Sequence, residues 1–191
     1  MSFLTGTSTE VLYSSIATAT QLNTFTTEDS LQKTLPPVII PAGFAFNAAA
    51  AGKSLRVKAC GRLGTTGAPT FTWNLRLLTS TTWSAGGIGF ATAALTAGTT
   101  QTLAPWYLDA EIIFRTLGIA AATTIAIMGE VRSPLGLATP FAGSIPANNT
   151  AFTAATYDNA LANYLFLSVA CGTSNAANLM QLEMLKCYGE N

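Results

Sequence analysis

The chain has 191 residues, of which 49% are hydrophobic and only 9% are charged, and its nine basic residues balance nine acidic ones. A net charge of zero gives no concentrated basic surface for phosphates, so the composition disfavours nucleic-acid binding. The sequence contains no histidine, which removes catalytic triads, histidine acid–base chemistry and histidine metal sites. The uncharged, Thr- and Ser-rich surface that remains favours one all-β domain that works by association, without a cofactor or metal.

Residues 1–30 are rich in Ser and Thr, and their apolar residues show no helical periodicity. We expect this segment to be an extended N-terminal arm, separate from a β-sandwich domain over residues 31–191; disorder of the arm is the alternative. Docking on a partner would cover its apolar side chains. The expected contact residues are Val11, Leu12, Ile16, Leu22 and Phe25.

From Lys33 onward, short strand-like runs alternate with turn clusters at the spacing of a β-sandwich. Pro36 and Pro37 interrupt the run 34–40 and place its early part at a sheet edge. Residues 55–63 and 70–77 then alternate between apolar and polar side chains, and the turn 65–69 joins them. This pattern predicts a first hairpin, in which Trp73 points into the core, and the phase of the run 106–115 places Trp106 in the core as well.

Two more pairs of alternating runs follow, residues 106–115 with 125–132 and residues 165–171 with 180–184. Each pair predicts a hairpin, and a weaker run over 88–92 brings the total to eight antiparallel strands. The long connection 133–163 shows no assignable secondary structure. The longest apolar stretch, residues 117–129, is too short to cross a bilayer, and the first residues lack a secretory signal, so we expect synthesis in a cytoplasm and no membrane contact.

Charged residues are distributed unevenly along the strands. Six basic and no acidic residues occur between Ser30 and Leu108. The first predicted hairpin carries Arg56, Lys58, Arg62 and Arg76, and the second carries Asp109, Glu111 and Glu130. These residues are either solvated strand residues that discourage edge pairing, or complementary charges at a subunit interface or on an acidic partner. Paired carboxylates for glycoside cleavage are a third, distant alternative.

Several segments resemble jelly-roll virion proteins of tailed bacteriophages. They are VLYSS at 11–15, VIIPAG at 38–43, LRV at 55–57, WNLRL at 73–77, WYLDAE at 106–111 and MQLEML at 180–185. The resemblance extends over nearly the whole chain, as a pattern of strands without an invariant motif. It implies an eight-stranded jelly roll and a structural role in a virion.

Proteins of this kind are capsid decoration (cement) proteins or minor tail proteins, and they are commonly trimeric. The leading hypothesis is therefore a non-catalytic decoration protein that trimerises, binds the major capsid protein lattice on the capsid exterior and stabilises the head. A minor tail or fibre protein is the alternative of the same class. A carbohydrate-binding module is the alternative of another class, and Trp83 is its candidate sugar-binding residue because it lies outside the strong strand patterns.

Overall fold

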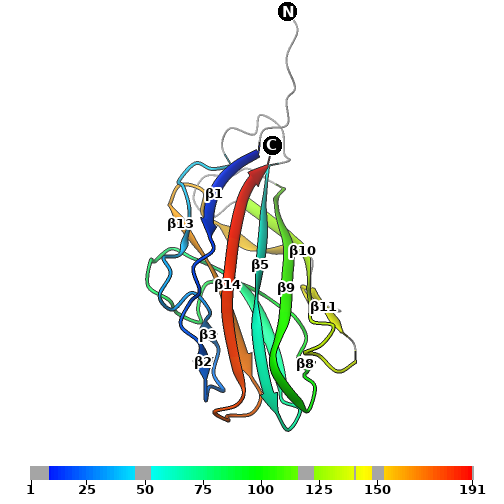
Figure 1. Cartoon of the computed structure of the whole chain (residues 1–191). Helices are drawn as coiled ribbons and strands as arrows, with labels where there is room; N and C mark the ends of the chain where they lie inside the picture. Colours follow the sequence, from blue (N-terminus) through cyan, green and yellow to red (C-terminus); the bar gives the residue numbers. More distant parts are fainter. Residues whose placement is uncertain (1–8, 46–52, 116–122, 140, 148–152, 191) are drawn as a thin grey trace, which may run out of the picture.

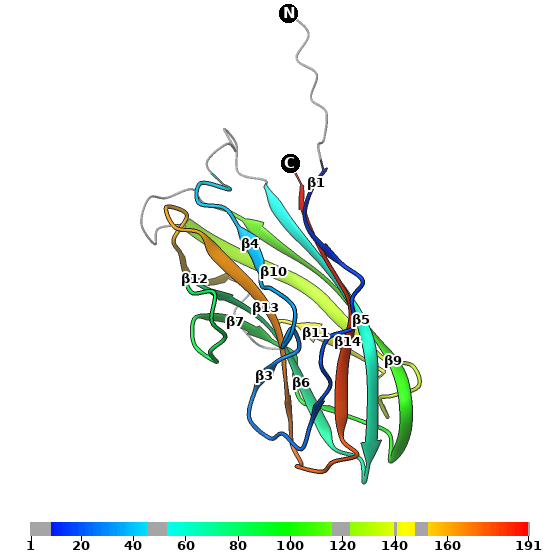
Figure 2. The ribbon, with the colours of Figure 1, turned by 60° about the vertical axis from the view of Figure 1, so that its left-hand side comes forward.

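The computed structural model describes residues 9–45, 53–115, 123–139, 141–147 and 153–190. Fourteen strands occur in these ranges, and they form two antiparallel sheets that face each other like a sandwich (Figures 1 and 2). The same ranges contain no helix that could span a membrane. The prediction of an all-β, antiparallel fold is confirmed, while the expected count of eight strands is too low.

The larger sheet has the strand order β1-β14-β5-β9-β10-β11, with β2 paired to β14 and β12 paired to β10. Its strands are β1 (Thr9–Ser15), β2 (Leu22–Asn23), β5 (Ser54–Thr66), β9 (Thr100–Phe114), β10 (Thr123–Arg132), β11 (Ala142–Ile145), β12 (Thr153–Tyr157) and β14 (Leu179–Glu190). The smaller sheet has the order β3-β13-β6-β7, with β4 paired to β13 and β8 paired to β6. Its strands are β3 (Asp29–Ser30), β4 (Val38–Ile40), β6 (Thr70–Leu78), β7 (Ile88–Ala91), β8 (Leu95–Thr96) and β13 (Asn163–Cys171).

Of the three expected hairpins, only the second is confirmed: β9 pairs with β10 from Tyr107 opposite Arg132 to Phe114 opposite Ile125. Strands β5 and β6 lie in different sheets, because the turn between them carries the chain across the sandwich, with Gly67 and Ala68 in left-handed backbone at φ 71° and 56°. Likewise β13 pairs with β6 and β14 with β5, so the third hairpin is also wrong. Period-two alternation predicts one buried face per strand, but not whether two strands share a sheet or face each other.

The amino-terminal segment is part of the sandwich from residue 9 onward. β1 pairs with β14 from Thr9 opposite Glu190 to Ser15 opposite Leu185, and β3 pairs with β13. Leu22 and Phe25 are 5% and 9% exposed within the core cluster. The expectation that these two side chains need a partner surface is therefore wrong, because the chain's own core covers them. Residues 1–8 of the expected arm lie outside the described residues.

Aromatic side chains fill the space between the sheets. Trp73 of β6 and Trp106 of β9 are fully buried, with ring centroids 6.2 Å apart, and Phe71 packs on Trp73 at 5.8 Å. These contacts confirm that both tryptophans occupy the core. Cys187 of β14 is also fully buried, and burial raises the pKa of its thiol to about 12.

The connection 133–163 contains two strands that the sequence did not predict. β11 pairs with the end of β10, and β12 pairs with its beginning. The expectation of no regular structure there is therefore wrong for these two segments. The run 88–92 is confirmed as β7. Strand β4 pairs only with β13, consistent with the edge position expected next to Pro37.

Candidate interaction surfaces

The outer face of the larger sheet carries most of the chain's charge, and we call it the charged face. Along β5, Val57 and Ala59 point into the core, so Arg56 and Lys58 point outward. The same alternation on β9, β10 and β14 turns further charged residues outward. Ten of the 18 charged residues lie there: Arg56, Lys58, Arg62, Asp109, Glu111, Glu130, Arg132, Glu183, Lys186 and Glu190.

Strand register arranges these charges in rows that cross the sheet. One row runs Lys186, Lys58, Asp109 and Glu130 over four adjacent strands. The next row places Arg56 beside Glu111, so again the cation is on β5 and the anion on β9. β14 and β5 together hold four cations and two anions, whereas β9 and β10 hold one cation and three anions. The charged face is therefore divided into a cationic half and an anionic half.

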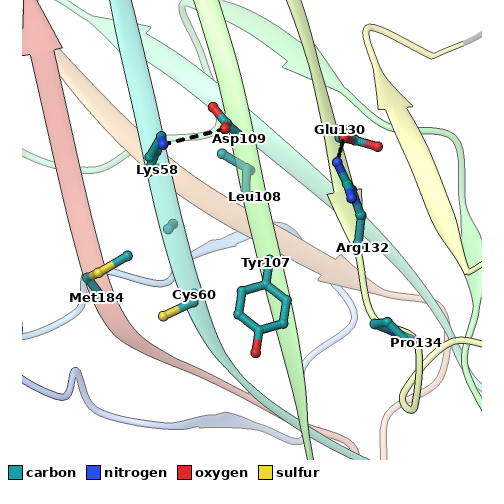
Figure 3. A pocket seen from close by; sticks show the side chains of 10 residues that line it. Lys58, Cys60, Tyr107, Leu108, Asp109, Glu130, Arg132, Pro134 and Met184 are labelled. Carbon is teal, nitrogen blue, oxygen red and sulfur yellow. Dashed lines mark hydrogen bonds and ion pairs between the residues drawn. The ribbon is translucent and has the colours of Figure 1, made fainter.

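Arg56 and Asp109 form the best-defined ion pair on this face. The Arg56 Nη2 lies 2.9 Å from Oδ2 of Asp109, and its Nε donates to Oδ1 at 3.1 Å. The Lys58 Nζ lies 3.8 Å from the same carboxylate (Figure 3). Hydrogen bonds from Arg56 hold the pKa of Asp109 below its usual value, despite partial burial. Asp109 is therefore a stable anion, and is not tuned to donate a proton.

Two further ion pairs lie on this face beside the pair of Arg56 and Asp109. They are Arg62 with Glu183 at 2.7 Å and Arg132 with Glu130. Six of the seven charges singled out in the sequence thus lie on one face. The carboxylates of Asp109, Glu111 and Glu130 share that face because β9 and β10 are neighbours. Glu183, at the bulge in β14, also lies outward beside Arg62, as the alternation of residues 180–184 predicts.

A shallow hollow of about 490 Å³ lies in the middle of the charged face. Its lining mixes charged and apolar groups, with Cys60, Tyr107 and Met184 beside Lys58 and Asp109 (Figure 3). Tyr107 is 53% exposed, and Met128, in the row of Glu111, is 58% exposed. Sequence alternation missed Met184, which was expected to point inward, because the bulge between Leu182 and Met184 shifts the phase of β14.

Arg76, the seventh predicted charge, lies apart on the outer side of the smaller sheet. Its guanidinium donates to both carboxylate oxygens of Glu28, and Ser168 donates to the same carboxylate at 2.6 Å. The expectation that Arg76 shares a face with Arg56 is therefore wrong, because β5 and β6 belong to different sheets.

A second exposed surface, the amino-terminal edge, consists of Val11 on β1 and Ile16 just after it. Their exposed fractions are 60% and 81%. Leu12 is partly buried against the core cluster. Of the five residues expected to dock on a partner, only Val11 and Ile16 thus present most of their apolar surface to solvent.

Trp83 lies on the other side of the molecule, over the smaller sheet. Its ring meets that of Phe166 edge-on at 5.6 Å, beside a hollow of about 170 Å³. This packing leaves Trp83 only partly exposed. The described residues contain no cluster of three or more Cys, Asp or Glu that could hold a metal ion.

Fold and surfaces together define an all-β protein of two antiparallel sheets with one charge-divided outer face. No protein-family model matches this chain, and no curated protein is significantly similar to it.

Proposed function

We propose that this protein is a non-catalytic structural protein of a virion, namely a capsid decoration (cement) protein. It associates with copies of itself, as a trimer by the resemblance described above, and binds the major capsid protein lattice from outside. There it adds contacts between neighbouring capsid subunits. Its activity is binding, and the exposed residues of the charged face and of the amino-terminal edge are the candidates for these contacts.

The observation that carries this proposal is the strand order. The chain crosses between the sheets after β2, β4, β5, β8, β12 and β13, and the last strand, β14, lies between β1 and β5. The order β1-β14-β5-β9 opposite β3-β13-β6-β7 supports a jelly roll, with β10, β11 and β12 as an addition to the larger sheet. Jelly rolls recur in viral capsid and lectin domains.

The electrostatics of the charged face also support binding over glycoside cleavage. A cleavage site needs one carboxyl group with a raised pKa beside a second carboxylate. Here Asp109 has a lowered pKa because Arg56 hydrogen-bonds it, and Glu130 pairs with Arg132.

The direct test is the location of the protein on particles. Gold-labelled antibodies against the purified chain are applied to intact phage-like particles from a culture that carries its gene. Label over the heads supports a decoration protein, and label confined to tails supports the minor tail or fibre alternative. Particles without label contradict both.

The carbohydrate-binding alternative has its own test. A glycan array is probed with the purified parent protein and with Trp83→Ala. Micromolar binding that disappears in Trp83→Ala would favour a carbohydrate-binding module. Absence of binding leaves the structural role as the better proposal, consistent with the packing of Trp83 on Phe166.

A further inference from the structure

We infer that the charged face is a two-fold contact surface on which a second copy of this chain packs face to face, with the symmetry axis parallel to the strands and between β5 and β9. This inference goes beyond the proposed function, because it names the occupant of the face and the symmetry of the contact. It does not depend on where the protein resides.

The division of charge selects this axis. A rotation of 180° about a line that runs between β5 and β9, in the plane of the contact, exchanges the two halves of the face. The cationic half, on β14 and β5, then covers the anionic half of the second copy, on β9 and β10. A rotation about a line perpendicular to the strands would place like charges over each other, which is unfavourable.

Two rows of the face are complementary in charge under this rotation. Lys58 of one copy faces Asp109 of the second copy, and Lys186 faces Glu130, because these residues occupy matching places on either side of the axis. In the neighbouring row, Arg56 faces Glu111 of the second copy. Each contact occurs twice in a two-fold pair, so one arrangement matches six cations with six anions.

Three charged residues of the face, Lys186, Glu111 and Glu190, form no ion pair with another described residue, unlike Arg56, Arg62 and Glu130. The second copy supplies an anion for Lys186 and a cation for Glu111. Ion pairing within one chain therefore explains only part of this charge pattern, and pairing between copies adds partners for Lys186 and Glu111.

Exposed apolar groups lie among these charges and would be covered by the same contact. Tyr188 and Met128 lie on either side of Arg56 and Glu111 in their row, and the rotation brings Tyr188 over Met128 of the second copy. Tyr107 likewise covers Cys60, in the hollow of the charged face. Partly exposed aromatic and Met side chains are enriched at the centres of protein interfaces.

The test uses two charge reversals in the full chain, Lys186→Glu and Glu130→Lys, with sedimentation equilibrium over a dilution series. The parent is expected to form dimers. If the proposed trimer also forms, the two contacts together would give hexamers. In a pair of identical variant chains, residue 186 of each copy faces a like charge at residue 130 of the other, so the repulsive contact occurs twice. Self-association of each variant should therefore weaken at least about tenfold. An equimolar mixture of the two variants should associate like the parent, since both cross-contacts then join opposite charges.

The matched control is Lys33→Glu, which reverses a charge on the far side of the sandwich, where Lys33 pairs with Asp29. It should associate like the parent, and circular dichroism should show that all three variants are folded. Single variants that associate like the parent, or a mixture that is not restored, would overturn the two-fold contact. A trimer whose stability is the same in the parent and in both variants would also overturn the two-fold contact, but it would support the proposed trimer.

Discussion

Arg76 and Glu28 form a bidentate ion pair on the outer side of the smaller sheet, with Nε 2.7 Å from Oε1 and side chains that are only 18% and 14% exposed. Ser168 of β13 donates a third hydrogen bond to the carboxylate. The residue before β3 is thereby tied to two strands of the sheet. This arrangement fixes the segment that links the amino-terminal strands to the rest of the domain.

Replacing Glu28 by Gln should therefore destabilise the fold. The variant loses charge-assisted hydrogen bonds and leaves Arg76 with a neutral partner, at a cost of about 2 kcal/mol in the free energy of unfolding. Urea denaturation of both proteins measures this difference. Glu10→Gln, at an exposed position of β1, is the matched control and should unfold like the parent. Equal stability of Glu28→Gln and the parent would show that the ion pair contributes nothing.

The ion pair of Glu28 and Arg76 should also affect how the free energy of unfolding depends on pH in the acid range. Burial alone would raise the pKa of Glu28, but hydrogen bonds from Arg76 and Ser168 outweigh it and lower the pKa below the ordinary value of 4.5. A lowered pKa in the folded state gives stability that is complete above the unfolded-state pKa and is lost as the pH falls through the folded-state pKa. The free energy of unfolding should therefore decrease below about pH 4.5, less steeply in Glu28→Gln than in the parent. Identical pH dependence in both proteins would contradict this assignment.

Buried residues of the amino-terminal segment should contribute more to the free energy of unfolding than its exposed residues. Phe25→Ala removes a side chain that is 9% exposed and should cost about 3 kcal/mol, whereas Ile16→Ala, at 81% exposure, should change the free energy of unfolding by less than about 0.5 kcal/mol. Deleting residues 1–29 should likewise destabilise the domain, because β14 loses its neighbour β1. Thermal melts by circular dichroism test all three changes. A deletion that melts like the parent would restore the idea of a separate arm.

The sequence predicts the fold class well because period-two alternation reports which side of a strand is buried. Trp73 and Trp106 are placed in the core on that basis alone, and both are fully buried. Alternation does not report the partner strand, which depends on contacts between residues far apart in the chain. That is why alternation predicts one hairpin from β5 and β6, which a short turn joins, although the two strands lie in different sheets.

The candidate surface was predictable only in part. Alternation predicts that Arg56, Lys58 and Asp109 point outward. Their meeting on one face follows from the pairing of β5 with β9, which brings together residues more than fifty positions apart in the sequence. Extending the alternation of the last strand would place Lys186 inward, but the bulge in β14 inverts the phase after Leu182 and turns Lys186 outward.

Gly61 should tolerate no side chain. A Cβ there would lie 1.9 Å from the backbone oxygen of Gln181 and 2.8 Å from the ring of Trp106. Gly61→Ala must therefore displace β14 or the central tryptophan, and we expect a loss of roughly 2 kcal/mol or more. Gly86→Ala is the matched control, because its Cβ would have only an ordinary contact with Ser84 at 3.6 Å. Chemical denaturation should separate the two variants, and equal stability would show that β14 yields at little cost.

Replacing both Val11 and Ile16 by Ser should separate folding from attachment to particles. Both side chains are mostly exposed, so the thermal melt should stay close to that of the parent. On a particle surface, burying their apolar area at about 25 cal/mol per Å² would supply a few kcal/mol, so their loss should weaken binding at least about tenfold after ordering costs. Co-sedimentation with particles that lack the protein measures this binding. A variant that co-sediments like the parent would place attachment elsewhere on the sandwich, and Thr9→Ser on the same strand serves as the control.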